Sequence, residues 1–245
     1  MAACPPQWPW PRACCRRRHD AVQVFKAWLA AATCDRDLSH AMQHFERVET
    51  LAVCLARAEP DFPAADLPVL RLAALAHDVL DHKYVSAAEA PRLEGEMRRV
   101  LGRDCGLAPE DVARVLLVAG NISLSLEKEN RLDWRGLRAH RCEHLRALVS
   151  DADKLEALGG RGLQRLLMYQ ASLGRVYDHG YTLPMLEEVR ALAAQHILPR
   201  ADWLCTEAAQ RLKPELHREL QAILQDDERL YAFCRATLEL LDQGA

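Results

Sequence analysis

The spacing of its apolar residues limits this chain to a helical fold. From Ala21 onward, apolar side chains recur at intervals of three and four residues, as in Val112, Val115, Leu116 and Ala119, which is the period of one face of an α-helix. Hardly any segment alternates between apolar and polar residues, as a half-buried strand would. Because 50% of the 245 residues are apolar, the chain can bury a sizeable core. We therefore predict an all-α protein.

Prolines and acidic residues mark where the helices begin. Asp66 and Pro68 precede one apolar segment, and Pro109 and Asp111 open another, as expected at helix N-termini. The helix over residues 184–212 is expected to break near Pro199. The predicted helices span 21–33, 37–58, 68–80, 87–103, 109–121, 136–158, 160–173, 184–212 and 214–241.

The first 20 residues differ in composition from the rest. They hold four prolines and three consecutive arginines, with no acidic residue before Asp20, as is typical of a disordered segment. An organelle-targeting peptide would also be basic, but this segment lacks a convincing amphipathic helix. We expect a disordered leader over 1–20 and one helical domain over 21–245, with its core at about 37–160 and a C-terminal helical extension over 161–245.

Charge and cysteine content narrow the classes of partner. The formal net charge is -3 and the pI is near 6.4, so nothing attracts the whole chain to nucleic acid or to an anionic membrane. No apolar run approaches the roughly 18 residues that a spanning helix needs. The nine cysteines contain no CxxC pair, which is typical of intracellular free thiols. We expect a soluble cytoplasmic protein. The sequence leaves its oligomeric state open, and a homodimer is one possibility.

Three segments place histidine or aspartate inside apolar helices. They are HAMQHFERV (40–48), AHDVLDHKY (76–84) and VSDADKLEALG (149–159). Ionised groups in a core cost several kcal/mol unless they are paired or bound to a metal. One cation shared by the three segments would satisfy them all, and imidazole and carboxylate ligands suit divalent Mn, Fe, Co, Ni or Zn. A site of two histidines and two aspartates leaves positions for water and substrate, which indicates catalysis.

The order of these residues resembles the HD-domain metal-dependent phosphohydrolase superfamily, whose signature is H…HD…D on an all-α core. Its YedJ-like branch of bacterial and fungal proteins typically shows HDxxHxxRV, HDxxDHKY, a VSxSxE-like segment and DADRLDALGA. This chain has HAMQHFERV, AHDVLDHKY, ISLSLEKE and DADKLEALGG in the same order, and the resemblance covers about residues 20–230. It implies a divalent ion (Mn, Co, Ni, Fe, Mg or Zn) held by His44, His77, Asp78 and Asp153, with Asp151 supporting the ligands from behind.

Two positions depart from the branch pattern. Ala41 stands where the branch has an aspartate, so a carboxylate that would orient His44 or a water is missing, which can lower metal affinity or rate. Glu156 stands where the branch usually has aspartate, which is a conservative change. A rival metal pair, His140 and His144, lies at i and i+4. Arginines surround that pair, so we favour a solvated helix face there.

The remaining candidate residues follow from position. Asp81 can orient the metal-activated water as base or acid, or can instead cap the chain and pair with Lys83. Lys83 and Arg47 are candidates to hold phosphate, although an internal ion pair explains Arg47 slightly better. His82 is expected to support the ligands. By the resemblance, three further residues line the mouth of the pocket: Ser123, Ser125 and Lys128.

These residues favour a metal-dependent phosphohydrolase that acts on a nucleotide or a related small phosphorylated metabolite, including the class of nucleoside triphosphate pyrophosphohydrolases. Two alternatives remain. The first is a non-catalytic nucleotide-binding HD module, suggested by Ala41. The second is a di-iron HD-fold oxygenase, which would need further histidines, and only His82, His140 or His144 could supply them.

Overall fold

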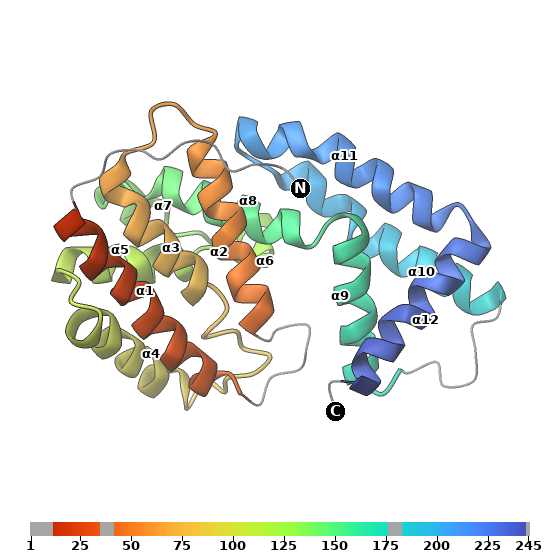
Figure 1. Ribbon diagram of the computed structural model, residues 1–245, viewed down its shortest axis with the longest axis horizontal. Coiled ribbons are helices and arrows are strands. Elements are labelled where there is room, and N and C mark those ends of the chain that lie inside the picture. The colour runs from red at the N-terminus through yellow and green to blue at the C-terminus, as the bar shows by residue number, and fades with distance from the viewer. Residues whose placement is uncertain (1–11, 35–41, 176–182, 244–245) are drawn as a thin grey trace.

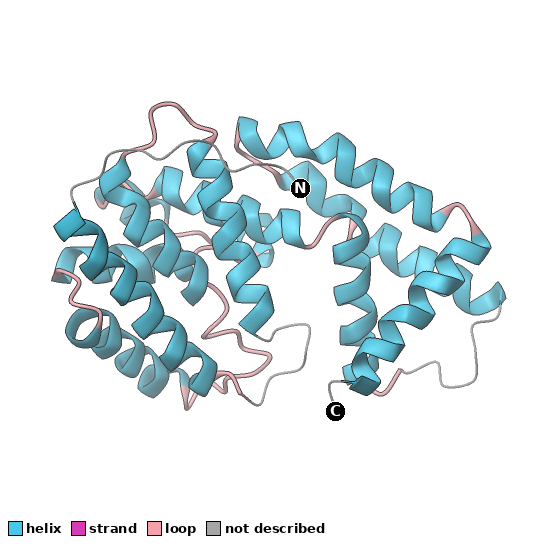
Figure 2. Cartoon of the chain, viewed as in Figure 1, coloured by secondary structure: helices cyan, strands magenta, loops and turns pink. Residues whose placement is uncertain are grey.

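The computed structural model describes residues 12–34, 42–175 and 183–243. Within these ranges the chain forms twelve α-helices and no strand (Figure 2), which confirms the predicted all-α class. The α-helices are α1 (Arg12–Ala32), α2 (Met42–Arg57), α3 (Leu67–Ala76), α4 (Ala90–Arg99), α5 (Pro109–Ala119), α6 (Leu124–Lys128), α7 (Trp134–Ala139), α8 (Glu143–Glu156), α9 (Gly159–Ser172), α10 (Leu183–His196), α11 (Glu207–Leu224) and α12 (Asp227–Gln243). Three shorter turns of other helix types are η2 (Ala64–Asp66), η3 (Val100–Asp104) and η4 (Leu198–Trp203).

Helix α8 connects two groups of helices. On one side α2, α3 and α8 pack together, and α1 and α5 cover the outer side of α3 (Figure 1). On the other side α9 packs against α11 and α12, while α10 packs against α12 and η4. Fully buried residues of the first group include Phe45 and Val48 from α2, Leu72 and Leu75 from α3, and Val149 from α8. Burying each such side chain stabilises the fold by about 1.5–3 kcal/mol.

Helix α3 ends earlier than its sequence predicts, and the early end shapes the candidate site. Seven of its ten residues are buried, so its apolar run extends around the helix. The predicted helix ran to residue 80, whereas α3 ends at Ala76 and the chain continues in tight turns, with Val79 N–H donating to the Ala76 carbonyl at 3.1 Å. The polar residues that follow therefore lie at a helix end.

Two long predicted helices are in fact divided. The helix predicted over 136–158 is α7 followed by α8, because Arg141 adopts a positive φ of 53° that no α-helix continues through. The expected break near Pro199 is present as η4. The sequence predicts a new helix from Pro214, but this proline lies inside α11. Helix α11 instead begins after Thr206, whose side chain accepts a hydrogen bond from the Ala209 N–H.

The N-terminal prediction placed a disordered leader over residues 1–20. Residues 1–11 lie outside the described part of the chain, but α1 already begins at Arg12. The four prolines of the leader all precede this point, and the alanine and arginine residues after it favour helix. The predicted start at residue 21 is therefore nine residues too late for this helix.

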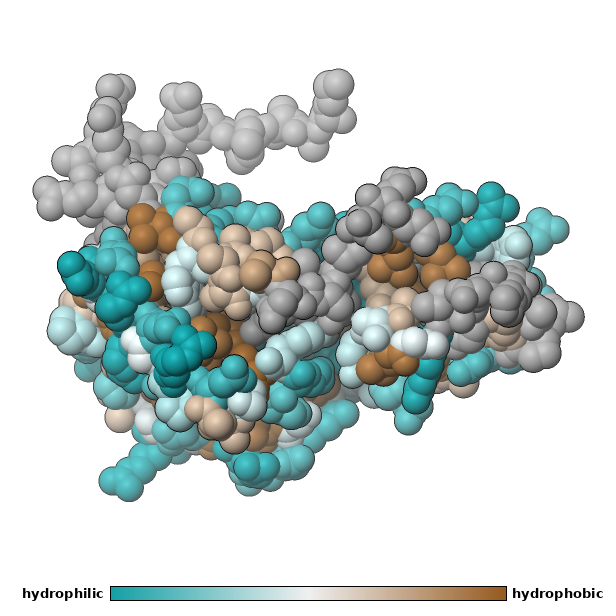
Figure 3. All heavy atoms as spheres, turned by 90° about the horizontal axis from the view of Figure 1, so that it is seen from below, coloured by the Kyte–Doolittle hydropathy of each residue, from teal (hydrophilic) through white to brown (hydrophobic). Residues whose placement is uncertain are grey.

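The surface offers little continuous apolar area on the face that Figure 3 shows, where hydrophilic and smaller hydrophobic areas alternate. None of the described helices combines the length and apolarity needed to cross a membrane. The large hydrophobic residues that are exposed in the described ranges are spread over several helices and loops: Val24, Trp134, Leu173, Leu212, Tyr231 and Leu240.

Asp151 on α8 connects the two helix groups. Its fully buried carboxylate accepts hydrogen bonds from the Cys205 N–H at 2.9 Å, the Thr206 N–H at 2.6 Å and the Thr206 hydroxyl at 2.8 Å. These donors lie at the start of α11, where a negative charge also interacts favourably with the helix dipole. The sequence prediction gave Asp151 a supporting role behind the metal ligands, and the structure instead shows it anchoring α11.

We predict that Asp151→Ala destabilises the protein by about 2–4 kcal/mol, because three buried donors lose their acceptor. Urea unfolding followed by circular dichroism measures this change. Asp202→Ala is the matched control, since that carboxylate is largely exposed and pairs only with Lys213, and it should cost less than about 0.5 kcal/mol. Equal stability of the two variants would contradict the anchoring role.

Candidate metal centre

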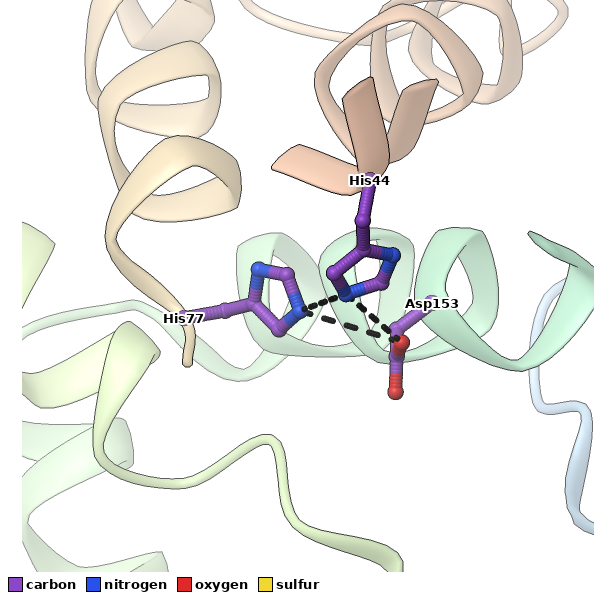
Figure 4. Close-up of side chains that lie close together, drawn as sticks. All are labelled: His44, His77 and Asp153. Carbon is purple, nitrogen blue, oxygen red and sulfur yellow. Dashed lines mark hydrogen bonds and ion pairs between the residues drawn. The ribbon is translucent and has the colours of Figure 1, made fainter. Parts of the chain in front are cut away.

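Three side chains from distant parts of the sequence meet where α2, the end of α3 and α8 come together. His44 lies near the start of α2, His77 directly follows α3, and Asp153 lies on α8 (Figure 4). The Nε2 atoms of the two imidazoles are 3.0 Å apart, and each lies 3.7 Å from Oδ1 of Asp153. Within the described residues, this is the group of His, Cys, Asp or Glu donors whose spacing can hold a metal ion.

Asp78 completes the group. Its Oδ2 atom lies 3.5 Å from Nε2 of His44 and 3.4 Å from Nε2 of His77. Neighbouring residues inside a helix point about 100° apart, but α3 ends at Ala76, so His77 and Asp78 can converge on one point. The structure thus brings together all four residues that the sequence predicts as metal ligands.

The hydrogen bonds on the far side of each imidazole fix the direction of its lone pair. Nδ1 of His77 lies 2.7 Å from the carbonyl oxygen of Ala74, and Nδ1 of His44 lies 3.3 Å from Oε2 of Glu156. Because both partners are acceptors, both Nδ1 atoms carry hydrogen, which leaves the Nε2 lone pairs as the ligand atoms. Two lone pairs that face each other at 3.0 Å repel unless a proton or a cation lies between them.

The donor spacing fits a divalent ion of the transition series. Ligands at about 2.1 Å from a metal stand roughly 3.0–3.4 Å apart for angles between 90° and 110°. The two Nε2 atoms are 3.0 Å apart, and each lies 3.4–3.7 Å from Oδ2 of Asp78 and Oδ1 of Asp153, close to that range. Two imidazole nitrogens and two carboxylates also match the preferences of Mn, Fe, Co, Ni or Zn. The residues present therefore fit the metal that the sequence implies.

Charge coupling within the group is strong. Burial disfavours protonated His77, but the carboxylates of Asp78 and Asp153 outweigh burial and raise the pKa of His77 to about 9. Burial also disfavours the two carboxylates, yet His77 and His44 hold the pKa of Asp78 well below its usual range and lower that of Asp153. In the metal-free protein a proton on His77 therefore takes the place of a cation.

Glu156 is the functional residue that sequence reasoning underrated. Besides the His44 imidazole, its buried carboxylate accepts hydrogen bonds from Arg47 at 3.3 Å and from Arg165. Its position, three residues after Asp153, places both acidic groups on one face of α8. The three-residue spacing could have indicated that Glu156 lies near His44, as it does. The branch pattern alone indicates only a conservative replacement of aspartate by glutamate.

The predicted phosphate-binding and catalytic residues lie beside the group with partners of their own. Arg47 pairs with Glu156 and donates to Gln43 at 2.8 Å, which is the ion-pair alternative for this arginine. Asp81 accepts the Lys83 N–H at 3.0 Å, and its other oxygen lies 3.8 Å from Nζ of Lys83. The structure thus shows Asp81 capping this turn and pairing with Lys83.

Four other candidates have no hydrogen bond or ion pair to the donor group within the described residues. His82 is 93% exposed in its side chain and pairs with Asp81 at 3.3 Å, and its supporting role stays a prediction. Ser123 and Ser125 are exposed. Lys128 lies over the ring of Trp203, 6.0 Å from its centroid. The Ala41 position lies outside the described residues.

The rival histidine pair does not form a second metal group in the described part of the chain. His140 ends α7, and Nε2 of His144 lies 2.6 Å from a carboxylate oxygen of Glu59. His144 therefore pairs with an acid across the surface. The di-iron alternative needs a second group of metal ligands that includes His82, His140 or His144. None of these histidines belongs to a donor group of three or more in the described residues.

Known proteins share this architecture. No protein-family model matches the chain. The uncharacterized protein YpgQ of Bacillus subtilis (strain 168) is 26% identical over 214 residues, which is 85% of this chain and 92% of YpgQ. The crystal structure of YpgQ in complex with ADP is similar at a TM-score of 0.59 and 27% identity, over 85% of this chain and 94% of that chain.

A third known structure has the same fold. An HD-superfamily hydrolase of Bacillus thuringiensis has a TM-score of 0.58 at 19% identity, over 85% of this chain and 95% of that chain. The chain therefore shares the all-α fold of that protein. The assignment to the YedJ-like branch stays a prediction.

We predict that metal binding displaces the proton of His77. Because its pKa is about 9 without metal, the apparent metal affinity should rise by about tenfold per pH unit between pH 6.5 and 8.5. Titration calorimetry with Mn²⁺ in two buffers of different ionisation enthalpy measures the protons released. An affinity that stays constant over this pH range would contradict the predicted exchange.

Proposed function

We propose that this chain, which has the HD-superfamily fold, is a metal-dependent phosphohydrolase acting on a nucleotide or a related small phosphorylated metabolite. The observation that carries the proposal is the pair of imidazole Nε2 atoms, 3.0 Å apart and flanked by two carboxylates. Such an arrangement is costly in a protein interior unless it binds a cation. The carboxylates of Asp78 and Asp153 are only partly buried, at 25% and 23% exposure of their side chains, so a substrate can reach the group.

His44, His77, Asp78 and Asp153 are the proposed ligands, with Mn²⁺ as the ion we favour. When bound, a divalent ion polarises a phosphoryl oxygen and lowers the pKa of water from 15.7 to about 7, which are the needs of phosphoester hydrolysis. The protein holds the donors in place beforehand, because Glu156 and the Ala74 carbonyl fix both imidazole rings. Removing the hydrogen-bond partners that orient metal ligands typically lowers the metal affinity of a site by about 10–100-fold.

We assign Lys83 to the substrate and Asp81 to the positioning of Lys83. Both oxygens of Asp81 contact the lysine, one through its backbone N–H and one through its ammonium. The Lys83 side chain is 47% exposed, so its ammonium can also meet an anionic ligand. Arg47 and Arg165 both pair with Glu156. One carboxylate cannot neutralise two guanidinium groups, so Arg47 can also interact with a phosphate.

A nucleotide is the substrate class best supported. The structurally similar YpgQ was crystallised in complex with ADP, and the likeness extends over 85% of this chain. A nucleotide also offers the phosphate that Lys83 and Arg47 would bind. We extend the proposal to one form of this activity in a cytoplasmic enzyme, in which water cleaves a nucleoside triphosphate into a nucleoside monophosphate and inorganic pyrophosphate.

We predict that Asp78→Asn and His77→Ala lower turnover by at least about a hundredfold, because each alters or removes a ligand of the proposed divalent ion, which would activate the water. The assay is a nucleotide panel with Mn²⁺ and Co²⁺ that measures phosphate and diphosphate separately. The matched controls are Asp202→Asn and His217→Ala, whose side chains form hydrogen bonds with Lys213 and Gln221 and no hydrogen bond or ion pair with the donor group in the described residues, so they should keep full activity. Melting curves confirm that each variant folds.

If the protein hydrolyses no nucleotide of the panel with either Mn²⁺ or Co²⁺, the proposal is contradicted. Tight nucleotide binding without turnover would favour the non-catalytic module instead.

We also predict one divalent ion per chain by elemental analysis of the purified protein, since only one donor group of three or more occurs in the described residues. Asp153→Ala should lose that ion, whereas Asp202→Ala should keep it. Two irons per chain would contradict the hydrolase and favour the oxygenase alternative.

A further inference from the structure

Helix α9 carries a row of cationic and aromatic side chains that the metal ligands leave unexplained. Arg161, Arg165 and Tyr169 occur at i, i+4 and i+8, so they lie along one face of the helix. Eight residues of α-helix span about 12 Å. The row is therefore long enough to contact more than one group of an extended ligand.

Arg165 shows which way this face of α9 points. Its guanidinium donates a hydrogen bond to Oε2 of Glu156, the same oxygen that lies 3.3 Å from Nδ1 of His44. One carboxylate oxygen thus joins the middle of the row to a proposed metal ligand. The Arg165 side of α9 therefore contacts the residue that supports the donor group; α2 and α9 themselves are seen in Figure 1.

The C-terminal end of the row meets the segment that follows the metal ligands. Nζ of Lys83 lies 5.7 Å from the centroid of the Tyr169 ring, within the range of a cation–π contact. Lys83 is five residues beyond Asp78. The row therefore has an arginine at one end, a lysine at the other, and the donor group beside its middle.

Arg161, at the first end, lacks the acidic partner that a structural arginine would have. It is exposed, and no hydrogen bond or ion pair holds its guanidinium in the described part of the chain. Its charge also acts on another cation, since burial and the positive charge of Arg161 lower the pKa of Arg47. Of the three arginines, only Arg47 and Arg165 pair with the carboxylate of Glu156 in the described part of the chain.

Such an excess of positive charge beside a phosphohydrolase centre favours an anionic ligand. A solvated surface arginine is normally placed near acids, or far from other cations, to limit repulsion. Here the like charges gather within reach of the donor group. A guanidinium also matches phosphate oxygens with paired donors.

We propose that Arg161 is a phosphate-binding residue that makes the site prefer substrates with two or more linked phosphates. The inference rests on the proposed function, since one phosphoryl group must lie at the donor group for a neighbouring one to reach Arg161. A single phosphate at the donor group would lie beside Arg47 and Lys83 and would gain little from Arg161.

The test measures binding of inorganic pyrophosphate and inorganic phosphate to the full-length protein loaded with Mn²⁺. By calorimetry, Arg161→Gln should weaken pyrophosphate binding by roughly tenfold or more and phosphate binding by less than about threefold. Arg161→Lys should keep part of the pyrophosphate affinity, because it keeps the charge. Arg103→Gln is the matched control, an exposed arginine of η3 on the other helix group, and should bind like wild type.

Steady-state kinetics with Mn²⁺ adds a second readout. Arg161→Gln should raise KM for nucleoside di- and triphosphates with little change in kcat, and should leave KM for monophosphates nearly unchanged. Wild-type pyrophosphate affinity in Arg161→Gln, or an equal loss for phosphate and pyrophosphate, would overturn the inference even in an active enzyme. Arg161-dependent pyrophosphate binding in a protein that hydrolyses nothing would support the inference and contradict the proposed function.

Discussion

The facing imidazoles of His44 and His77 are the interaction on which the rest of the site depends. Their Nε2 atoms approach to 3.0 Å because each ring is held from behind, one by a carboxylate and the other by a backbone carbonyl. Fixed Nδ1 hydrogens turn both lone pairs toward the same point, and two carboxylates face that point as well. A positive charge there is a requirement of the fold, whether a proton or a metal ion supplies it.

That requirement explains how the helices are arranged around the site. Helix α3 is short, so the consecutive residues His77 and Asp78 reach the same point from a helix end. Helix α8 supplies Asp153 to the centre and Glu156 to its support, one turn apart. The same helix carries Asp151, which anchors α11 through three hydrogen bonds. A single helix therefore fixes the donor group and connects it to the C-terminal helices.

The charges around the centre change in sign from inside to outside. The donors themselves are two acids and two histidines, which suits a cation. Just outside them, Arg47 and Arg165 pair with one glutamate, and the charge of Arg161 acts on Arg47, which suits an anion. A bound phosphate would lie between the cation and this outer layer, in contact with both.

The sequence by itself determined the helical class and the identity of the four converging residues. Helical spacing of apolar residues fixes the class, because each helix must bury one face, and polar residues within such helices are too costly to be incidental. The tertiary structure decided which neighbours each residue meets. Glu156 as the support of His44, Asp151 as the anchor of α11 and Arg161 beside Arg47 depend on contacts between helices far apart in the chain. Such contacts follow from how helices pack. Local spacing can place Glu156 on the same face of α8 as Asp153, but it does not identify the partner from another helix that each residue meets.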